Sequence, residues 1–66
     1  MEIICNGERR QVPAGISVAE LLSTLEVPQR GVAVEVNQRV LSRAEHPSSL
    51  LAEGDQVEVV SLVGGG

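Results

Sequence analysis

The chain is short, acidic and free of aromatic residues, and these features exclude several classes of protein. It has 66 residues, a formal net charge of −4, one His and one Cys, and neither Lys, Phe, Tyr nor Trp. One Cys and one His cannot form an internal disulfide or a four-ligand zinc site, so a single small domain has to rely on aliphatic packing. Without Lys or Tyr for covalent or acid–base chemistry, we expect no enzymatic activity of its own and no metal site.

Binding to nucleic acid or to a membrane is not expected either. The acidic balance would repel phosphate groups, and no aromatic side chain is available to stack on bases. The sequence contains no run of about 18 apolar residues, so no membrane span is predicted. We also expect no signal peptide, because the chain does not start with a basic and then an apolar segment. Together with the lone Cys, these features predict a cytoplasmic protein.

The first quarter of the chain predicts a β-hairpin. Residues 1–6 are short and β-favouring, with Ile3 and Cys5 on one side of the strand. Asn6-Gly7 is a strong signal for a type I′ turn, which needs positive φ at both positions. A return strand is expected from Glu8 to about Val12, where Pro13 stops it.

A helix follows. Ser17 and Glu20 form the pattern of a capping box, in which each side chain accepts a hydrogen bond from a main-chain N–H at the helix start. The spacing of the next aliphatic residues predicts one apolar stripe. Its members are Val18, Leu21, Leu22 and Leu25. We expect the helix to run for roughly ten residues and to end at Val27-Pro28, because a residue before proline disfavours the α region.

The second half predicts three strands and an irregular link. A strand is expected over residues 32–36, then a turn at Asn37-Gln38 and a short strand over 39–41. The link over 42–51 has room for one helical turn, and a last strand is expected over 56–63. Its polar–apolar alternation breaks at Val59-Val60, so apolar residues fall on both faces, as in a central strand. The order predicts an α+β fold, ββαββ-link-β, with one helix on one face of a mixed sheet and the last strand parallel to the first.

Three glycines, Gly64, Gly65 and Gly66, follow the last strand directly. We interpret the chain as a domain over residues 1–63 and a flexible tail over 64–66. Such a tail can be a passive end or a cloning remnant. It can also be a reactive terminus, because glycine has no Cβ and passes through a narrow channel, and its free carboxylate can be activated as an acyl-adenylate.

At these positions the chain resembles the ThiS family, whose members carry sulfur for thiamine biosynthesis. The resemblance covers the whole chain and is most specific at the strand turns and at the glycine end. The matching segments are Asn6-Gly7, residues 18–22, 35–40 and 54–60, and Val63-Gly-Gly-Gly66. It implies the ubiquitin-like β-grasp fold.

The resemblance also implies a mechanism that uses the main chain. A ThiF-type adenylating enzyme would bind ATP and magnesium, so the chain needs no cofactor of its own, and would adenylate the carboxylate of Gly66. Sulfur from a persulfide donor would replace AMP and leave a thiocarboxylate. Thiazole synthase would then take this sulfur into the thiazole ring.

Other functions stay open at this point. The small subunit of molybdopterin synthase shares the fold, the tail and the chemistry, although its members tend to be longer and to carry aromatic residues. A ubiquitin-like protein modifier would join Gly66 to lysines of its targets. A passive β-grasp interaction domain with an accidental glycine tail is the remaining alternative.

The remaining polar and sulfur-containing side chains are expected to be structural or solvated. We interpret Cys5 as a buried, inert core thiol, because free Cys is among the most buried residue types. His46, before a proline in the link, is expected to be a solvated loop residue, because no partner for a proton relay is evident. Glu53, Asp55 and Glu58 are expected to form a solvated turn and edge, with a possible docking role for some of them.

Val60 and Leu62 are predicted to lie on the sheet face opposite the helix, with Ile4 as a possible neighbour. They would either pack beneath the irregular link or form an apolar docking patch for the adenylating enzyme and thiazole synthase. On the second interpretation, the partner-binding residues are Val60 and Leu62 together with Gly64 and Gly65 of the tail.

Overall fold

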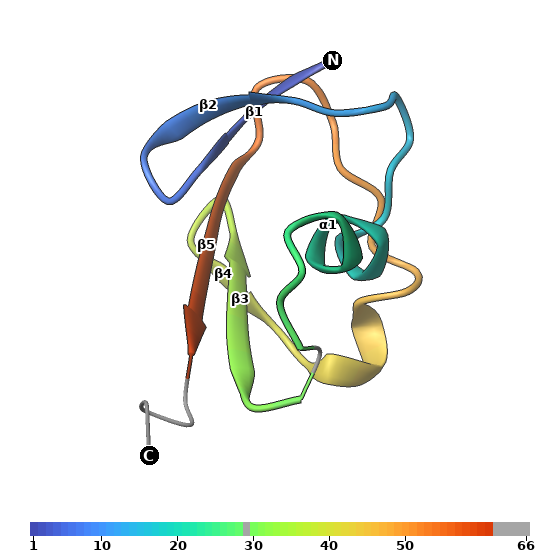
Figure 1. Ribbon diagram of the computed structural model, residues 1–66, viewed down its shortest axis with the longest axis vertical. Helices are drawn as coiled ribbons and strands as arrows, with labels where there is room; N and C mark the ends of the chain where they lie inside the picture. The colour runs from blue at the N-terminus through green and yellow to red at the C-terminus, as the bar shows by residue number, and fades with distance from the viewer. Residues whose placement is uncertain (29, 62–66) are drawn as a thin grey trace.

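The computed structural model describes residues 1–28 and 30–61, and in them it confirms the predicted order of elements (Figure 1). One helix lies over one face of a mixed five-stranded sheet. The elements are β1 Glu2–Cys5, β2 Glu8–Gln11, α1 Val18–Thr24, β3 Val32–Val36, β4 Arg39–Leu41, the 3₁₀ turn η1 Arg43–Glu45 and β5 Gln56–Ser61.

Strand β5 occupies the centre of the sheet, as its apolar sequence predicts. The strand order is β2-β1-β5-β3-β4. β5 runs parallel to β1 and antiparallel to β3. Parallel neighbours need a crossover connection, and here all the intervening chain, including α1, supplies it.

Both predicted hairpin turns have the backbone of a type I′ turn. Asn6 and Gly7 have φ values of 50° and 81°, and Asn37 and Gln38 have φ values of 53° and 71°. The primed turn matches the twist of the flanking strands. It therefore sets the register in which β1 pairs with β2 and β3 with β4.

The helix begins where the capping box predicts. The Ser17 hydroxyl accepts from the Glu20 N–H at 3.1 Å, and the Glu20 carboxylate accepts from the Ser17 N–H at 2.9 Å. Each side chain satisfies a main-chain donor that would have no partner within the helix.

The helix is seven residues long and ends at Thr24, earlier than predicted. The chain leaves the helix at Glu26, which adopts a left-handed φ of 59°. The Glu26 N–H donates to the Ser23 carbonyl at 3.1 Å and the Val27 N–H to the Leu22 carbonyl at 3.0 Å. This hydrogen-bond pair is a Schellman motif, whose left-handed position is usually glycine but is occupied by Glu26 here.

The core is aliphatic and lies between the sheet and the helix. Its buried members are Ile3, Cys5, Val12, Ile16, Val18, Leu21, Leu22, Val34, Leu41, Leu51 and Val57. The link after β4 closes this core from the helix side. Its Leu51 N–H donates to the Ile16 carbonyl at 2.9 Å, and Leu50 forms an isolated bridge with Ser17.

Candidate functional site

The predicted reactive end follows directly from the central strand. Gly66, Gly64, Gly65 and Leu62 lie outside the described residues, and so does the predicted boundary between domain and tail. The described chain reaches Ser61, the exposed last residue of β5, five residues before the end of the sequence. The described part of the candidate site therefore consists of the surfaces around the end of β5.

The outer face of the sheet exposes Val60, which lies on the face opposite the helix as predicted. Its side chain is 53% exposed and lies opposite Ala33 of β3. The prediction that Ile4 is a neighbour of Val60 is wrong, because Ile4 pairs with Gln56, four residues before Val60 in β5. Packing beneath the irregular link is also wrong for Val60, since the link covers the other face of the sheet.

Two acidic residues are register partners on this outer face. Glu58 of β5 lies directly opposite Glu35 of β3, and Val40 of β4, 65% exposed, lies on the other side of Glu35. Glu58 is exposed as expected, but it sits in the central strand and not at an edge. Like charges directly opposite each other are destabilising. The face therefore combines exposed valines with negative charge that a cationic partner would neutralise.

The two acids of the turn before β5 hold the main chain. The Glu53 carboxylate accepts from the Glu2 N–H at 3.1 Å. The Asp55 carboxylate accepts from the Ala52 N–H at 2.8 Å and from the Asn37 side-chain amide at 3.0 Å. Asp55 is half-buried, so its contribution to the structure goes beyond the solvated role that the sequence predicts.

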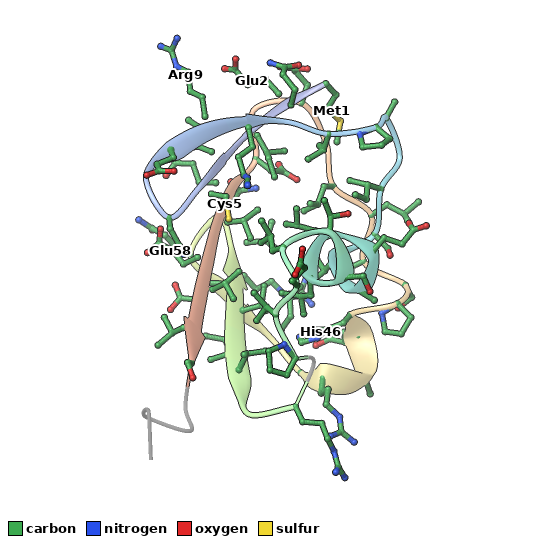
Figure 2. All side chains as sticks on the ribbon, viewed as in Figure 1. Met1, Glu2, Cys5, Arg9, His46 and Glu58 are labelled. Atoms are coloured by element: carbon green, nitrogen blue, oxygen red, sulfur yellow. The ribbon has the colours of Figure 1, made fainter. Side chains whose placement is uncertain are left out.

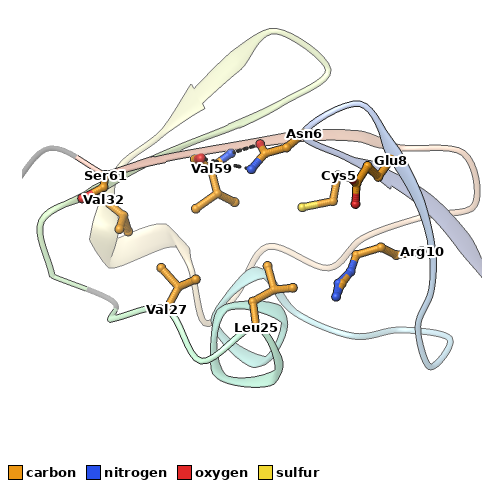
Figure 3. Close-up of a pocket in the computed structure, with 9 residues that line it drawn as sticks. All are labelled: Cys5, Asn6, Glu8, Arg10, Leu25, Val27, Val32, Val59 and Ser61. Atoms are coloured by element: carbon orange, nitrogen blue, oxygen red, sulfur yellow. Dashed lines mark hydrogen bonds between the residues drawn. The ribbon is translucent and has the colours of Figure 1, made fainter. Parts of the chain in front are cut away.

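A groove lies on the helix side of the sheet, beside the end of β5 (Figure 3). Its volume is about 420 Å³. Strands β1, β2, β3 and β5 line one side, and the chain that leaves α1 lines the other. Apolar groups come from Cys5, Leu25, Val27, Val32 and Val59, and polar groups from Asn6, Glu8, Arg10 and Ser61.

Cys5 lies in this groove and is buried, as predicted, with 6% of its surface exposed. Burial raises the pKa of the Cys5 thiol; the Arg10 charge lowers it, and the charges of Glu58 and Glu8 raise it. The thiolate is the nucleophilic form of cysteine. A raised pKa keeps the thiol neutral at pH 7, so the environment of Cys5 suits a core residue.

The side chain of Asn6 binds the main chain of β5. The sequence predicted the turn at Asn6-Gly7 but not this contact. The Asn6 amide nitrogen donates to the Val59 carbonyl at 3.3 Å, and its oxygen accepts from the Val59 N–H at 2.8 Å (Figure 3). Asn37 makes a related contact at the start of the strand, where its side-chain oxygen accepts from the Gln56 N–H at 3.0 Å. Asparagine at the first turn position was the only sequence signal for either contact.

His46 is buried, and the prediction of a solvated loop residue is wrong. Only 1% of its surface is exposed, and neither ring nitrogen has a hydrogen-bond partner among the described residues. The main chain explains the burial: the His46 carbonyl accepts from the Ala19 N–H at 3.0 Å, and its N–H donates to the Arg43 carbonyl at 3.2 Å. These bonds hold the link against the start of α1 and place the imidazole on the helix side of the sheet (Figure 2).

Neither a cluster of metal ligands nor a buried ion pair is found among the described residues. Within residues 1–28 and 30–61, no three His, Cys, Asp or Glu side chains lie together as metal ligands would. The same part of the chain has one ion pair, between Arg39 and Glu45 at 3.5 Å, and it is solvent-exposed. None of the described helices is long and apolar enough to cross a membrane.

A family model described as the ThiS family matches residues 2–66 of the sequence, which covers the strands, the outer face and the glycine end together. The chain belongs to the ThiS family. The resemblance stated from the sequence is therefore confirmed.

Known members of the ThiS family match this chain over its whole length. The sulfur carrier protein ThiS of Escherichia coli is 33% identical over 66 residues, which cover all of both chains. The crystal structure of the thiamine biosynthesis protein ThiS from Geobacter metallireducens superposes with a TM-score of 0.85, at 38% identity over all of both chains. This likeness confirms the β-grasp fold of the chain.

ThiS-like sequence also occurs inside larger proteins. The thiazole synthase of Magnetococcus marinus is 42% identical over 66 residues, which are all of this chain and 20% of that protein. The chain spans about a fifth of the length of the curated thiazole synthases it matches. In those proteins a ThiS-like segment is covalently part of a thiazole synthase.

Proposed function

We propose that this ThiS-family chain is a sulfur carrier of thiamine biosynthesis that works as a protein co-substrate. Sulfur is carried as a thiocarboxylate at Gly66. The observation that carries the proposal is the family match, which extends through Gly66 on a chain whose central strand ends five residues earlier. Two relatives named as sulfur carriers match over 66 and 61 residues of this chain.

The first step activates an otherwise unreactive carboxylate. In the proposed reaction a carboxylate oxygen of Gly66 attacks the α-phosphorus of ATP, pyrophosphate leaves, and an acyl-adenylate forms. In this proposal a ThiF-type adenylating enzyme holds ATP and magnesium and brings them to the Gly66 carboxylate. The mixed anhydride is a competent acyl donor, which the free carboxylate is not.

Sulfur enters in the second step. The terminal sulfur of a persulfide donor attacks the acyl carbon, AMP leaves, and an acyl disulfide forms. A thiol then attacks the donor's sulfur in this disulfide, which releases the Gly66 thiocarboxylate and leaves the donor in a new disulfide. Thiazole synthase takes this sulfur into the thiazole ring, and the acyl carbon of Gly66 receives an oxygen atom in exchange, which restores the carboxylate.

The chain itself contributes presentation and docking. Glycines at the end leave no side chain to obstruct entry into a partner's active site. The docking face we propose is centred on Val60, beside Glu35 and Glu58 on the outer face of the sheet, and we propose that Leu62 also contributes to it. This combination suits a partner surface with an apolar contact and an arginine or lysine.

Intact-mass spectrometry tests the proposal directly. The protein is incubated with ATP, magnesium, a persulfide donor, a thiol and a ThiF-type enzyme. We expect a gain of about 16 Da, the difference between sulfur and oxygen. A persulfide on Cys5 would instead add about 32 Da, so the two sites of sulfur loading are distinguishable by mass.

Two variants complete this test. Deleting Gly66 should abolish the mass gain while the domain stays folded, and Cys5→Ala should retain it. Adding thiazole synthase together with its small-molecule substrates should return the loaded carrier to its original mass. Wild-type protein that never gains mass refutes the carrier function. A loaded carrier that thiazole synthase cannot unload, but the large subunit of molybdopterin synthase with its substrate can, assigns the chain to the molybdenum cofactor.

A further inference from the structure

The central strand β5 extends beyond the end of its neighbour β1. In Figure 1 the β1–β2 hairpin lies at the top of the view, and β5 continues downward past it beside β3. Main-chain bonds run from the Ile4 N–H to the Asp55 carbonyl and from the Asn6 N–H to the Val57 carbonyl, each at 2.9 Å. The spacing of a parallel ladder would bring the next donor, two residues on, to the carbonyl of Val59. The chain has reversed by then, at Asn6-Gly7.

The side chain of Asn6 takes the place of the missing strand residue. A carboxamide has one carbonyl and an N–H group, like a peptide unit. Its nitrogen donates to the Val59 carbonyl at 3.3 Å and its oxygen accepts from the Val59 N–H at 2.8 Å (Figure 3). The side chain therefore extends the β1 ladder by one step along β5.

Beyond this contact, β5 is paired on one side. β3 stays paired with it through Val32 and Ser61. On the β1 side, Asn6 provides the last hydrogen bonds to β5 that the described residues make. Pairing on one side leaves a strand end free to fray.

We propose that Asn6 is a positioning residue for the carrier reaction. Its side chain holds the end of β5, and so determines where and in which direction the reactive end leaves the domain. Without it, β5 frays back toward Val57, and the frayed residues have to be ordered again each time the carrier docks on its adenylating enzyme. This inference rests on the proposed function, because it assigns the strand end a role in presenting the carboxylate.

Asn37 provides a matched control within the same chain. It has nearly the same turn conformation, with a φ of 53° against 50° for Asn6. Its side-chain oxygen accepts from the Gln56 N–H at 3.0 Å, at the start of β5, where Ile4 of β1 also pairs with the strand. Asn6→Gly and Asn37→Gly each remove one side-chain amide while glycine tolerates the positive φ. The two variants differ in which end of β5 is released.

The experiment compares both variants in thiocarboxylate formation with the adenylating enzyme, at equal concentrations of folded protein. For Asn6→Gly we expect kcat/KM to fall about tenfold, the size expected when about one residue has to be ordered again on docking. The loss should fall on KM, because a carrier already seated on the enzyme no longer depends on Asn6. Asn37→Gly should stay within about twofold of the wild type.

Amide hydrogen exchange gives a second result that needs no enzyme. Asn6→Gly should lose protection over residues 59–61, whereas Asn37→Gly should keep it there. Asn6→Asp should be intermediate in both measurements, because it keeps the acceptor for the Val59 N–H but places a second oxygen against the Val59 carbonyl.

The outcomes separate this inference from the function on which it rests. Wild-type protein that gains no mass refutes the carrier function. An active wild type with equal kcat/KM in the two glycine variants overturns the positioning role. Unchanged exchange over residues 59–61 in Asn6→Gly overturns it as well, whether or not the reaction proceeds.

Discussion

The two faces of the sheet are built from the same strands but differ in burial and charge. On the helix face, Val57 of β5 is fully buried and Val59 packs against the core. On the outer face, Val60 is half exposed and Glu58 lies in solvent opposite Glu35. Alternate residues of one strand therefore differ in their surroundings: the helix face stabilises the fold, and the outer face is exposed, where we propose that a partner docks.

The largest expected difference in stability between the two faces comes from truncating one valine on each of them and comparing the losses. Val57→Ala should lower the free energy of unfolding by about 2–3 kcal/mol, because it leaves a cavity in the core. Val60→Ala should change it by less than about 0.5 kcal/mol, because the side chain is exposed. Urea denaturation of both variants measures the difference. Equal losses would show that the outer face is also part of the core.

A smaller effect is expected at the buried imidazole on the helix side. His46→Leu removes the two ring nitrogens, which have no partners among the described residues, and fills the same space with an apolar side chain of similar size. We expect the free energy of unfolding to rise by about 1 kcal/mol, because buried polar atoms without hydrogen bonds are unfavourable. His46→Asn, which keeps a buried polar group, serves as the control. A loss of stability in the leucine variant would point to a hydrogen bond that the imidazole makes, for example to a buried water.

On the outer face, the opposed carboxylates offer a test of docking. Glu58→Gln should raise the free energy of unfolding by about 0.2–1 kcal/mol, because it removes a like-charge pair across two strands. The same variant should bind the adenylating enzyme more weakly, and its binding should depend less on salt. Glu8→Gln, which changes the charge by the same amount on the helix face, is the matched control for binding titrations. Equal weakening in both variants would place the effect in overall charge and not in this face.

The smallest expected effect on stability comes from the ionisation of Cys5, and it can be measured only at alkaline pH. Burial raises the pKa of its thiol above the ordinary value of 9.0, so the unfolded chain loses this proton first. The thiol's contribution to stability is complete below that value and is lost as the pH rises through the raised pKa. Lys and Tyr, which would titrate in this range, do not occur in the sequence. Stability measured from pH 8 to 11 should therefore fall more steeply in the wild type than in Cys5→Ala; parallel curves would contradict the prediction.

The local patterns of the sequence predicted most of the fold because short-range physics determines them. Asn6-Gly7 specifies its turn, and Ser17 with Glu20 specifies the helix start, through bonds between near neighbours. The apolar character of β5 predicted its central place and its pairing with β1. The helix end was misplaced, because Glu26 adopts a left-handed conformation that residue preferences disfavour.

The surfaces around the candidate site depended on the tertiary structure. Val60 was correctly predicted to face away from the helix, but its neighbour Ala33 follows from the β3–β5 register. The burial of His46 and the contact of Asn6 with Val59 join residues far apart in the chain. Side-chain preferences at one position carry no information about such partners. The role of Gly66 stays a prediction from family membership.

By itself, the sequence determined that this small acidic chain has neither Lys nor aromatic residues and that three glycines follow its most apolar strand. Period and turn chemistry, which act over a few residues, were enough for that. Only the tertiary structure decided that β5 runs past β1 and that the Asn6 amide holds it there. The physical reason is that a hydrogen bond between residues 53 positions apart forms only when the whole sheet brings them together.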